Sequence, residues 1–219
     1  MRADLHVHST YSDDGRQTVA EILARCKELG IGAVAISDHN VMEAHKEADT
    51  LGSGIIIVPA MEITTEAGHV LALGIREPVA RGLPVGETIG LVHAAGGIAV
   101  AAHPYRAWSG LGEQNVMGHD FDAVEISNGR SKRIGNLRAR RLAKRMCLPG
   151  TGGSDAHNVQ SIGRAFTEVP DSCRDHEDVI KAIMDRRCRA FGSGQGTSGT
   201  AGTGIRSVLR WFRRGFRRM

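Results

Sequence analysis

Short apolar runs alternate with amphipathic segments along most of this chain. The clearest run places Ile55, Ile56, Ile57 and Val58 in succession, which predicts a strand buried on both faces. Its bounds are expected at 55–61. Further strands are expected at residues 3–8, 33–37, 70–75, 98–102, 121–126, 165–169 and 189–191, with a short strand or turn at 150–153.

Helical spacing of apolar residues fills the stretches between these runs. Val19, Ile22, Leu23 and Cys26 share one face of a helix over 18–29, and Gly30 ends it. Other helices are expected at residues 41–51, 86–95, 131–146 and 177–185. The alternation predicts an α/β fold with a parallel sheet, but periodicity alone does not separate an open doubly wound sheet from a closed barrel.

Histidines and carboxylates lie at or near the ends of the apolar runs. On the first strand Asp4, His6 and His8 point to the same side, because strand side chains alternate with period two. Nine residues are candidate metal ligands: His6, His8, Asp13, His39, Glu62, His69, His103, Asp155 and His157. Imidazole with carboxylate suits Zn, Mn and Fe, which activate water for hydrolysis.

Single histidines carry much less information than this set. His45, His93, His119 and His176 are each interpreted as surface or packed residues. The grouped motifs are stronger because each follows a strand-like run, where α/β folds place their chemistry.

These motifs resemble the PHP (polymerase and histidinol phosphatase) superfamily, and in particular its short TrpH-like phosphoesterases. The resemblance rests on Asp4-Leu-His-Val-His8-Ser9, Ser12-Asp13, Ser37-Asp-His-Asn40, Glu62-Ile63, His103-Pro104 and Gly153-Ser-Asp-Ala-His157, and it covers about residues 1–192. It implies a distorted seven-stranded (β/α) barrel with the metal site at the C-terminal ends of the strands.

The resemblance also implies two or three divalent ions (Mn, Zn or Fe). One would be held by His6, His8, Glu62 and Asp155, a second by Asp13, His39 and His157, and a third by Glu62, His69 and His103. A metal-activated hydroxide would attack the phosphorus of a phosphoester. Asp155, His157 and His39 would act in catalysis, with Arg106 and Arg164 holding phosphate oxygens.

Some of these assignments have a second interpretation. Asp13 lies in Ser-Asp-Asp-Gly, where an acid also suits a turn, and His69 is either a ligand or a substrate contact. Asp4 and Asp38 are interpreted as partners that orient imidazoles. Arg130 is a weaker candidate for phosphate binding than Arg106 or Arg164, and each arginine is otherwise a solvated surface charge.

The positive charge of the chain is concentrated at its C-terminal end. The net charge is +4, but residues 193–219 contain six arginines and no acid, so residues 1–192 carry about −2. Residues 193–204 have the composition of a Gly/Ser/Thr linker. Residues 205–219 are a basic amphipathic helix or a disordered tail, which would contact an anionic membrane surface, nucleic acid, the chain's own barrel or a second copy.

Composition favours a cytoplasmic enzyme, peripheral at the membrane if the tail binds lipid. Four cysteines show no Cys-x-x-Cys spacing, and no 18-residue apolar run or signal peptide is visible. We therefore expect a metal-dependent phosphoesterase acting on a nucleotide, a short oligonucleotide end or a small phosphorylated metabolite. The alternative is a non-catalytic metal-binding adaptor module.

Overall fold

Two five-stranded sheets form the frame of the protein. The structure is a computed structural model that describes residues 1–192 and Gly194, so the predicted tail and nearly all of the linker lie outside the described residues. In spatial order, one sheet contains β10 (Arg189–Gly192), β9 (Ala165–Glu168), β1 (Arg2–Val7), β2 (Ile31–Ile36) and β3 (Ile56–Ile57). The other contains β4 (Ala60–Thr64), β5 (His69–Leu73), β6 (Ile98–Ala101), β7 (Ala123–Asn128) and β8 (Gly150–Gly153).

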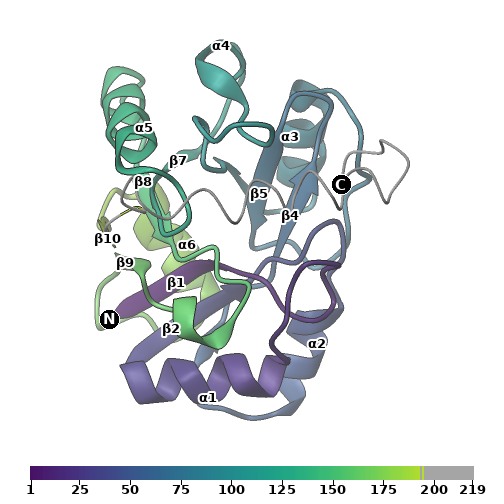
Figure 1. Cartoon of the computed structure of the whole chain (residues 1–219), viewed down its shortest axis with the longest axis vertical. Coiled ribbons are helices and arrows are strands. Elements are labelled where there is room, and N and C mark those ends of the chain that lie inside the picture. Colours follow the sequence, from purple (N-terminus) through teal and green to yellow (C-terminus); the bar gives the residue numbers. More distant parts are fainter. Residues whose placement is uncertain (193, 195–219) are drawn as a thin grey trace.

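Helices cover the sheets on opposite sides of the molecule (Figure 1). One group is α1 (Val19–Leu29) and α2 (Glu43–Thr50), which pack beside β1 and β2. The other group, beside the second sheet, is α3 (Val85–Ala94), α4 (Gly112–Met117) and α5 (Arg133–Arg145), while α6 (His176–Met184) packs on a core shared by both sheets. A 3₁₀ turn spans Val159–Ser161. The predicted helices are all present, whereas α4 was not expected.

The first helix shows how local chemistry sets the element bounds. Thr18 accepts a hydrogen bond from the backbone of Glu21, whose side chain accepts one from the Thr18 backbone, so two amides at the helix start are satisfied. Gly30 closes the other end with φ of 64°, a left-handed conformation that costs glycine little. Both bounds agree with the prediction.

The predicted α/β fold is present, but the closed seven-stranded barrel is not shown, because no sheet formed by the described residues closes on itself. The strands are also not uniformly parallel, because β4 pairs antiparallel with β5, and β5 with β6, as β9 does with β1 and β10. The predicted strand at 55–61 is divided into β3 and β4 around Pro59, which has no amide to donate. Glu62 therefore lies within β4 rather than at a strand exit.

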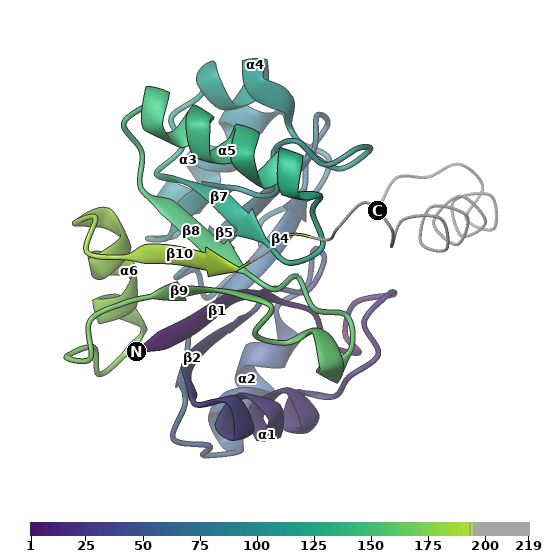
Figure 2. The ribbon, with the colours of Figure 1, turned by 60° about the vertical axis from the view of Figure 1, so that its left-hand side comes forward.

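The two sheets meet at two seams, and Figure 2 shows β1 and β9 of the first sheet alongside β8 of the second. At one seam Val7 of β1 bridges to Ala156 beyond β8, and His8 N–H donates to the Ala156 carbonyl at 2.9 Å. At the other, His39 beyond β2 bridges to Glu62 of β4. Apolar residues of both sheets, including Leu5, Leu71 and Val100, share one core cluster. The seams bring together the chain segments that carry the candidate ligands.

Candidate metal centre

Glu62 is the hub of a buried cluster of histidines. Its Oε2 lies 3.3 Å from His6 Nε2, 3.3 Å from His8 Nε2 and 3.2 Å from His39 Nδ1. Its Oε1 lies 2.8 Å from both His69 Nδ1 and His103 Nε2. Five imidazoles from both sheets and from three connecting segments thus surround one carboxylate that is 1% exposed.

Several ring nitrogens in this cluster have no hydrogen-bond partner among the described residues. They are His6 Nε2, His8 Nε2, His39 Nδ1 and His103 Nδ1, all buried. Leaving a buried polar atom unpaired is costly, so this many in one place point to a missing partner. Three of them face Glu62 without hydrogen-bond geometry. Mixed imidazole and carboxylate donors are the set that holds Zn, Mn or Fe, and the residues therefore fit a metal centre.

Hydrogen bonds on the far side of two rings fix which nitrogen faces the cluster. His6 Nδ1 lies 3.0 Å from Glu125 Oε1, and an ionised carboxylate only accepts, so Nδ1 carries a proton and Nε2 points at Glu62. His8 Nδ1 lies 3.2 Å from Ser12 Oγ, which donates its own proton to Asp38 at 2.7 Å. Ser12 must therefore accept from His8 Nδ1–H. Such contacts orient metal-binding histidines.

Glu125 is a site residue that sequence reasoning missed. Besides its contact to His6, its Oε2 accepts from the His103 backbone at 2.8 Å and from Asn128 Nδ2 at 3.0 Å. The sequence contains a signal for it. The apolar run at 121–126 holds two acids, Asp122 near its start and Glu125 in its interior. A carboxylate within a buried strand needs partners, which here are the ligands themselves.

Asp155 forms the opposite wall of the cluster. It leaves β8 with φ of 52°, and His103 leaves β6 with φ of 26°, both in the left-handed region that non-glycine residues seldom adopt. Its Oδ1 lies 3.6 Å from His8 Nε2 and 3.5 Å from His157 Nδ1. Backbone strain at two neighbouring site residues turns their side chains inward, as is common at functional sites.

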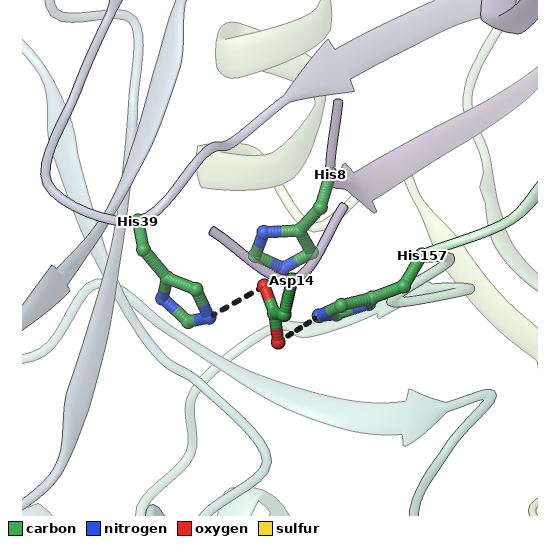
Figure 3. A group of neighbouring side chains, drawn as sticks. All are labelled: His8, Asp14, His39 and His157. Atoms are coloured by element: carbon green, nitrogen blue, oxygen red, sulfur yellow. Dashed lines mark ion pairs between the residues drawn. The ribbon is translucent and has the colours of Figure 1, made fainter. Parts of the chain in front are cut away.

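The cluster contains Asp14 rather than the predicted Asp13. In Figure 3 Asp14 lies between His39 and His157, with its Oδ2 2.9 Å from His157 Nε2 and its Oδ1 3.9 Å from His39 Nε2. Asp13 is exposed and lines the adjoining cavity. A tight turn decides between the adjacent acids: a side chain at Gly15 would clash with the Ser9 carbonyl, and Gly15 N–H donates to Ser12 at 3.2 Å.

The other eight predicted ligands all belong to the cluster. The side chains group into four overlapping sets that can hold a metal ion: His8, Asp14, His39 and His157; His6, Glu62 and His103; His6, His8 and Asp155; and His39, Glu62 and His69. His69 contacts Glu62 directly, which places its ring with the ligands. His6, His8, His39 and Glu62 each belong to two sets. A neutral imidazole can serve only one ion, so the sets that share a histidine are alternatives, whereas the two oxygens of Glu62 could serve adjacent ions.

Two arginines border the cluster. Arg106 pairs with Asp155 Oδ2 and donates to Asn128 Oδ1 at 2.6 Å. Arg130 Nη1 lies 3.3 Å from Asp155 Oδ1 and 2.7 Å from His157 Nε2. Arg164, predicted to bind phosphate, is exposed, and no hydrogen bond or ion pair of the described residues joins its side chain to the cluster. Arg130, which the sequence favoured less, lies at the cluster where Arg164 was expected.

Asp4 and Asp38 support the cluster in different ways. Asp38 accepts from Ser12 Oγ and from Ser9 N and Oγ at 2.6–2.7 Å, so it orients the His8 ring through Ser12. Asp4 does not contact an imidazole: it accepts from the backbone of Ser154 at 2.8 Å and Gly163 at 2.9 Å. Burial raises the pKa of Asp4 to about 6 despite these hydrogen bonds. Its role is to fix the backbone next to Asp155.

Burial and charge prepare the side chains for metal binding. Burial lowers the pKa of His8 to about 4 and of His39 to about 3, so both rings are neutral near pH 7. Burial opposes ionisation of Glu62, but His69, His6 and His39 hold its pKa well below the usual range. Burial likewise opposes a charged His6, yet Glu125 and Glu62 raise its pKa well above normal. Neutral imidazoles beside ionised carboxylates are the metal-binding state, which His8 and His39 already have, whereas His6 would give up a proton when an ion binds.

A cavity of about 540 Å³ opens beside His39. Apolar side chains of Val41, Pro78 and Val79 line one part of it, and Tyr11, Asp13 and Arg81 contribute polar groups. The volume lies within the range of small-molecule sites. The cavity is therefore large enough for an organic group attached to something held at the cluster.

The fold and this cluster define a PHP-like protein, and the chain belongs to the PHP family. The family model described as PHP domain matches residues 4–117, and the model described as PHP-associated matches residues 133–188. An uncharacterised protein of Methanocaldococcus jannaschii is 34% identical over 161 residues, covering 67% of this chain and 94% of the relative.

Two further proteins are similar to this chain. A solved two-domain protein of Bacteroides vulgatus, described as containing a predicted PHP-like metal-dependent phosphoesterase, superposes with a TM-score of 0.73 at 18% identity, covering 88% of this chain and 65% of that one. A phosphoribosyl 1,2-cyclic phosphate 1,2-diphosphodiesterase of Eggerthella lenta is 34% identical over 85 residues, 35% of this chain and 32% of the relative. The first likeness shows the fold.

Two remaining expectations concern the environment of the protein. None of the helices in the described part of the chain is long and apolar enough to cross a membrane. The four cysteines are all free thiols, with Cys26 and Cys173 buried. No disulfide therefore stabilises the described fold, which agrees with the scattered cysteine spacing.

Proposed function

We propose that this protein hydrolyses phosphoesters at the Glu62-centred cluster with two or three divalent ions of Mn, Zn or Fe. The observation that carries the proposal is the convergence of five imidazoles on one buried carboxylate, with unpaired ring nitrogens facing it. When bound, the ions supply Lewis acidity and lower the pKa of a water molecule to near neutrality. The family membership and the phosphodiesterase relative support the same reaction class.

The protein's own groups would position the substrate. Arg106 and Arg130 both reach Asp155, and guanidinium groups at this rim suit the non-bridging oxygens of a phosphoryl group. The cavity beside His39 would take the organic part of the ester. Val41 and Val79 suit an apolar or ring-shaped group there, and Arg81 suits a second anion.

Three substrate classes fit this arrangement: a nucleotide, the end of a short oligonucleotide and a small phosphorylated metabolite. The cavity is open along one side of the cluster, which accommodates each of them. The domain from residue 1 to 192 would contain the whole reaction centre, because every residue of the cluster precedes residue 158. The rival assignment is a non-catalytic module that binds metal for stability alone.

The decisive experiment compares metal content with hydrolysis. Purified protein is stripped with chelator, reconstituted with Mn or Zn, and assayed on a chromogenic phosphomonoester, a chromogenic diester and a short oligonucleotide. We expect at least two ions per chain and metal-dependent hydrolysis. His39→Gln should abolish turnover, while His93→Gln should not, since His93 pairs with Asp122 outside the cluster.

Each alternative has its own result. Metal bound at two or more ions per chain without hydrolysis of any ester would favour the adaptor module. Fewer than one ion per chain after reconstitution would contradict the metal centre itself. Equal turnover in the two histidine variants, with unchanged circular dichroism, would place the chemistry elsewhere.

A further inference from the structure

Helix α5 carries cations that the rest of the described protein does not neutralise. It contains no acidic residue. Arg145 pairs with Glu113, and the Arg138 guanidinium stacks 4.1 Å from the centre of the Tyr105 ring. The remaining cations have no ion pair in the part of the chain that the structure describes; they are Arg133, Arg140, Arg141 and Lys144. All four are exposed.

Three of these cations form a line along the helix. Arg133, Arg140 and Lys144 are separated by seven and four residues, so with Leu137 between them they occupy one face. We call Arg133, Leu137, Arg140 and Lys144 the α5 stripe. Eleven residues of helix extend about 16 Å at 1.5 Å each. A cavity of about 180 Å³ lies along its first half, lined by Arg133, Asn136, Leu137 and Arg140, with Ser127 and Gly192 opposite.

Helix α5 is linked to the metal centre through Asn136 and Asn128, although no residue of the α5 stripe contacts the cluster. Asn136, one turn into the helix, holds the backbone of Asn128 with both side-chain atoms, at 3.2 and 3.0 Å. Asn128 Nδ2 in turn donates to Asp155 Oδ2 at 3.0 Å. Arg130, which precedes the helix, also reaches Asp155. Positive charge thus continues from the cluster onto the helix, which lies along the second sheet beside β7 and β8 (Figure 2).

Exposed apolar side chains accompany the cations. Leu137 is 49% exposed and Ile134 is 62% exposed, and neither packs in a core cluster of the described residues. A polyanion that offered only phosphates would leave both in water. A ligand with regularly spaced phosphates and flat apolar surfaces between them would contact both kinds of side chain, and single-stranded nucleic acid has that chemistry.

We propose that the α5 stripe binds the backbone of a single-stranded nucleic acid whose end lies at the metal centre. The phosphates contact Arg133, Arg140 and Lys144, and a base packs on Leu137 or Ile134. A membrane surface is the poorer match, because three of the four unpaired cations follow one line, and Arg133 and Arg140 of that line border a cavity. The inference rests on the proposed function for the position of the strand's end, but binding itself requires no turnover.

Binding to a labelled oligonucleotide tests the α5 stripe. The anisotropy of fluorescent 12-nucleotide oligothymidine is measured in chelator, so that hydrolysis cannot interfere. The test variant combines Arg133→Gln, Arg140→Gln and Lys144→Gln. The control combines Lys27→Gln, Lys46→Gln and Arg76→Gln, which make the same charge change at exposed positions away from α5. Circular dichroism checks that both variants fold.

We expect the α5 stripe variant to raise Kd at least tenfold and the control to change it less than threefold. Each phosphate contact on a single strand contributes about 0.7 to the slope of log K against log salt, so losing three should lower the slope by about 2. Hydrolysis of the small chromogenic ester by the metal-loaded α5 stripe variant should stay near wild type, because none of the three residues contacts the cluster.

Several outcomes would overturn the inference. They are equal weakening by both variants, an unchanged salt slope, or loss of binding to phosphatidylserine vesicles with oligonucleotide binding intact. Failure of the proposed function gives a different pattern, in which the α5 stripe variant loses oligonucleotide binding although the wild type hydrolyses no ester. The two results are therefore distinguishable.

Discussion

The hydroxyl of Ser12 fixes the ring of His8 without touching the centre of the cluster. Ser12 Oγ lies 3.2 Å from His8 Nδ1, accepts from the His39 backbone at 2.9 Å and donates to Asp38 at 2.7 Å. Its one proton is committed to Asp38, so the His8 proton must stay on Nδ1. The lone pair on Nε2 is then always presented to Glu62 and Asp155.

Replacing Ser12 with alanine should therefore weaken metal binding. Ser12→Ala removes the acceptor for His8 Nδ1–H, and loss of such a supporting contact costs about 10- to 100-fold in metal affinity. The measurement is competition with a chromophoric chelator. Ser53→Ala is the matched control, because Ser53 caps only an exposed turn at Ile55. An unchanged affinity in Ser12→Ala would mean that packing alone orients His8.

Glu125 should matter for stability even without metal. In Glu125→Gln an NH2 group, which only donates, replaces one of the two accepting oxygens. It would then face another donor, either His6 Nδ1–H or the two groups that donate to Oε2. An unsatisfied buried donor costs about 1–3 kcal/mol. Urea unfolding of the metal-free protein should show that the free energy of unfolding falls by this amount. The control Glu28→Gln, which removes an exposed pair with Arg25, should change it by less than about 0.5 kcal/mol. Equal effects would contradict this role.

The adjacent acids of the first loop give a sharp test of the site. Asp14→Asn removes a carboxylate held between His39 and His157 and should reduce the number of ions bound or their affinity at least tenfold. Asp13→Asn should leave metal content unchanged, because Asp13 lines the cavity instead. Metal analysis of both variants decides between them. A larger effect at Asp13 would restore the assignment made from the sequence.

Metal-free protein should lose stability as the pH falls from about 6.5 to about 4. In this window His8 and His39 become protonated in the unfolded chain but stay neutral in the fold. Burial lowers their pKa from 6.5 to about 4 and about 3, respectively. At these two sites the unfolded state then binds more protons, which decreases stability on acidification. Asp4 acts in the opposite direction, because burial raises its pKa to about 6, but it is one group against two, so the net stability still falls. Glu62 and Asp155, whose pKa values stay well below normal, extend the loss below about pH 4.5.

His6 does not offset this loss. Its raised pKa contributes stability that is fully present below pH 6.5 and is lost only as the pH rises toward its folded value. Urea unfolding at a series of pH values in chelator is the measurement. His8→Gln should flatten part of the slope, while His93→Gln should not. Stability that is flat or increases toward pH 4 would show that the buried rings are not held neutral.

The C-terminal tail can be tested by deletion. Removing residues 195–219 leaves β10 paired with β9 and all of the cluster intact, so hydrolysis of a small ester should stay near wild type. The six deleted arginines would each contribute about 1 kcal/mol near an anionic bilayer. Sedimentation with phosphatidylserine vesicles at low salt should therefore fall in the truncated protein. Equal pelleting of both forms would exclude the tail as an anchor.

The positions of helices and strands could be predicted from local sequence patterns, whereas the way in which the strands pair into sheets could not. The helix at 18–29 was predictable because capping residues and apolar spacing lie within one short segment. The interruption at Pro59 and the antiparallel turn of β4 into β5 depend on how strands pair, which a continuous apolar run does not reveal. In this antiparallel hairpin Glu62 pairs with Leu71 and lies diagonally across from His69, so the two side chains meet without any strand exit.

Site residues divide in a similar way. Histidines in grouped motifs were identifiable, because their residue type already limits their chemistry. Asp13 and Asp14 are adjacent and differ in the direction that a turn gives their side chains. Arg130 follows β7 and reaches Asp155, whereas Arg164 lies just before β9 and is exposed. The position of Glu125 within an apolar run marks it as a buried charge, but its role comes from contact with His6, 119 positions away, which the sequence does not reveal. Such choices are made by tertiary contacts.

The seams between the sheets also set an order of events for a newly made chain. The residues of the cluster are spread along the chain from His6 to His157. They come together only where the two sheets join. Two of the four sets are complete by residue 103, but the two that include Asp155 or His157 need the end of the domain. Binding of the full complement of ions would thus follow assembly of both sheets, and a fully loaded centre would mark a chain whose two halves have met in register.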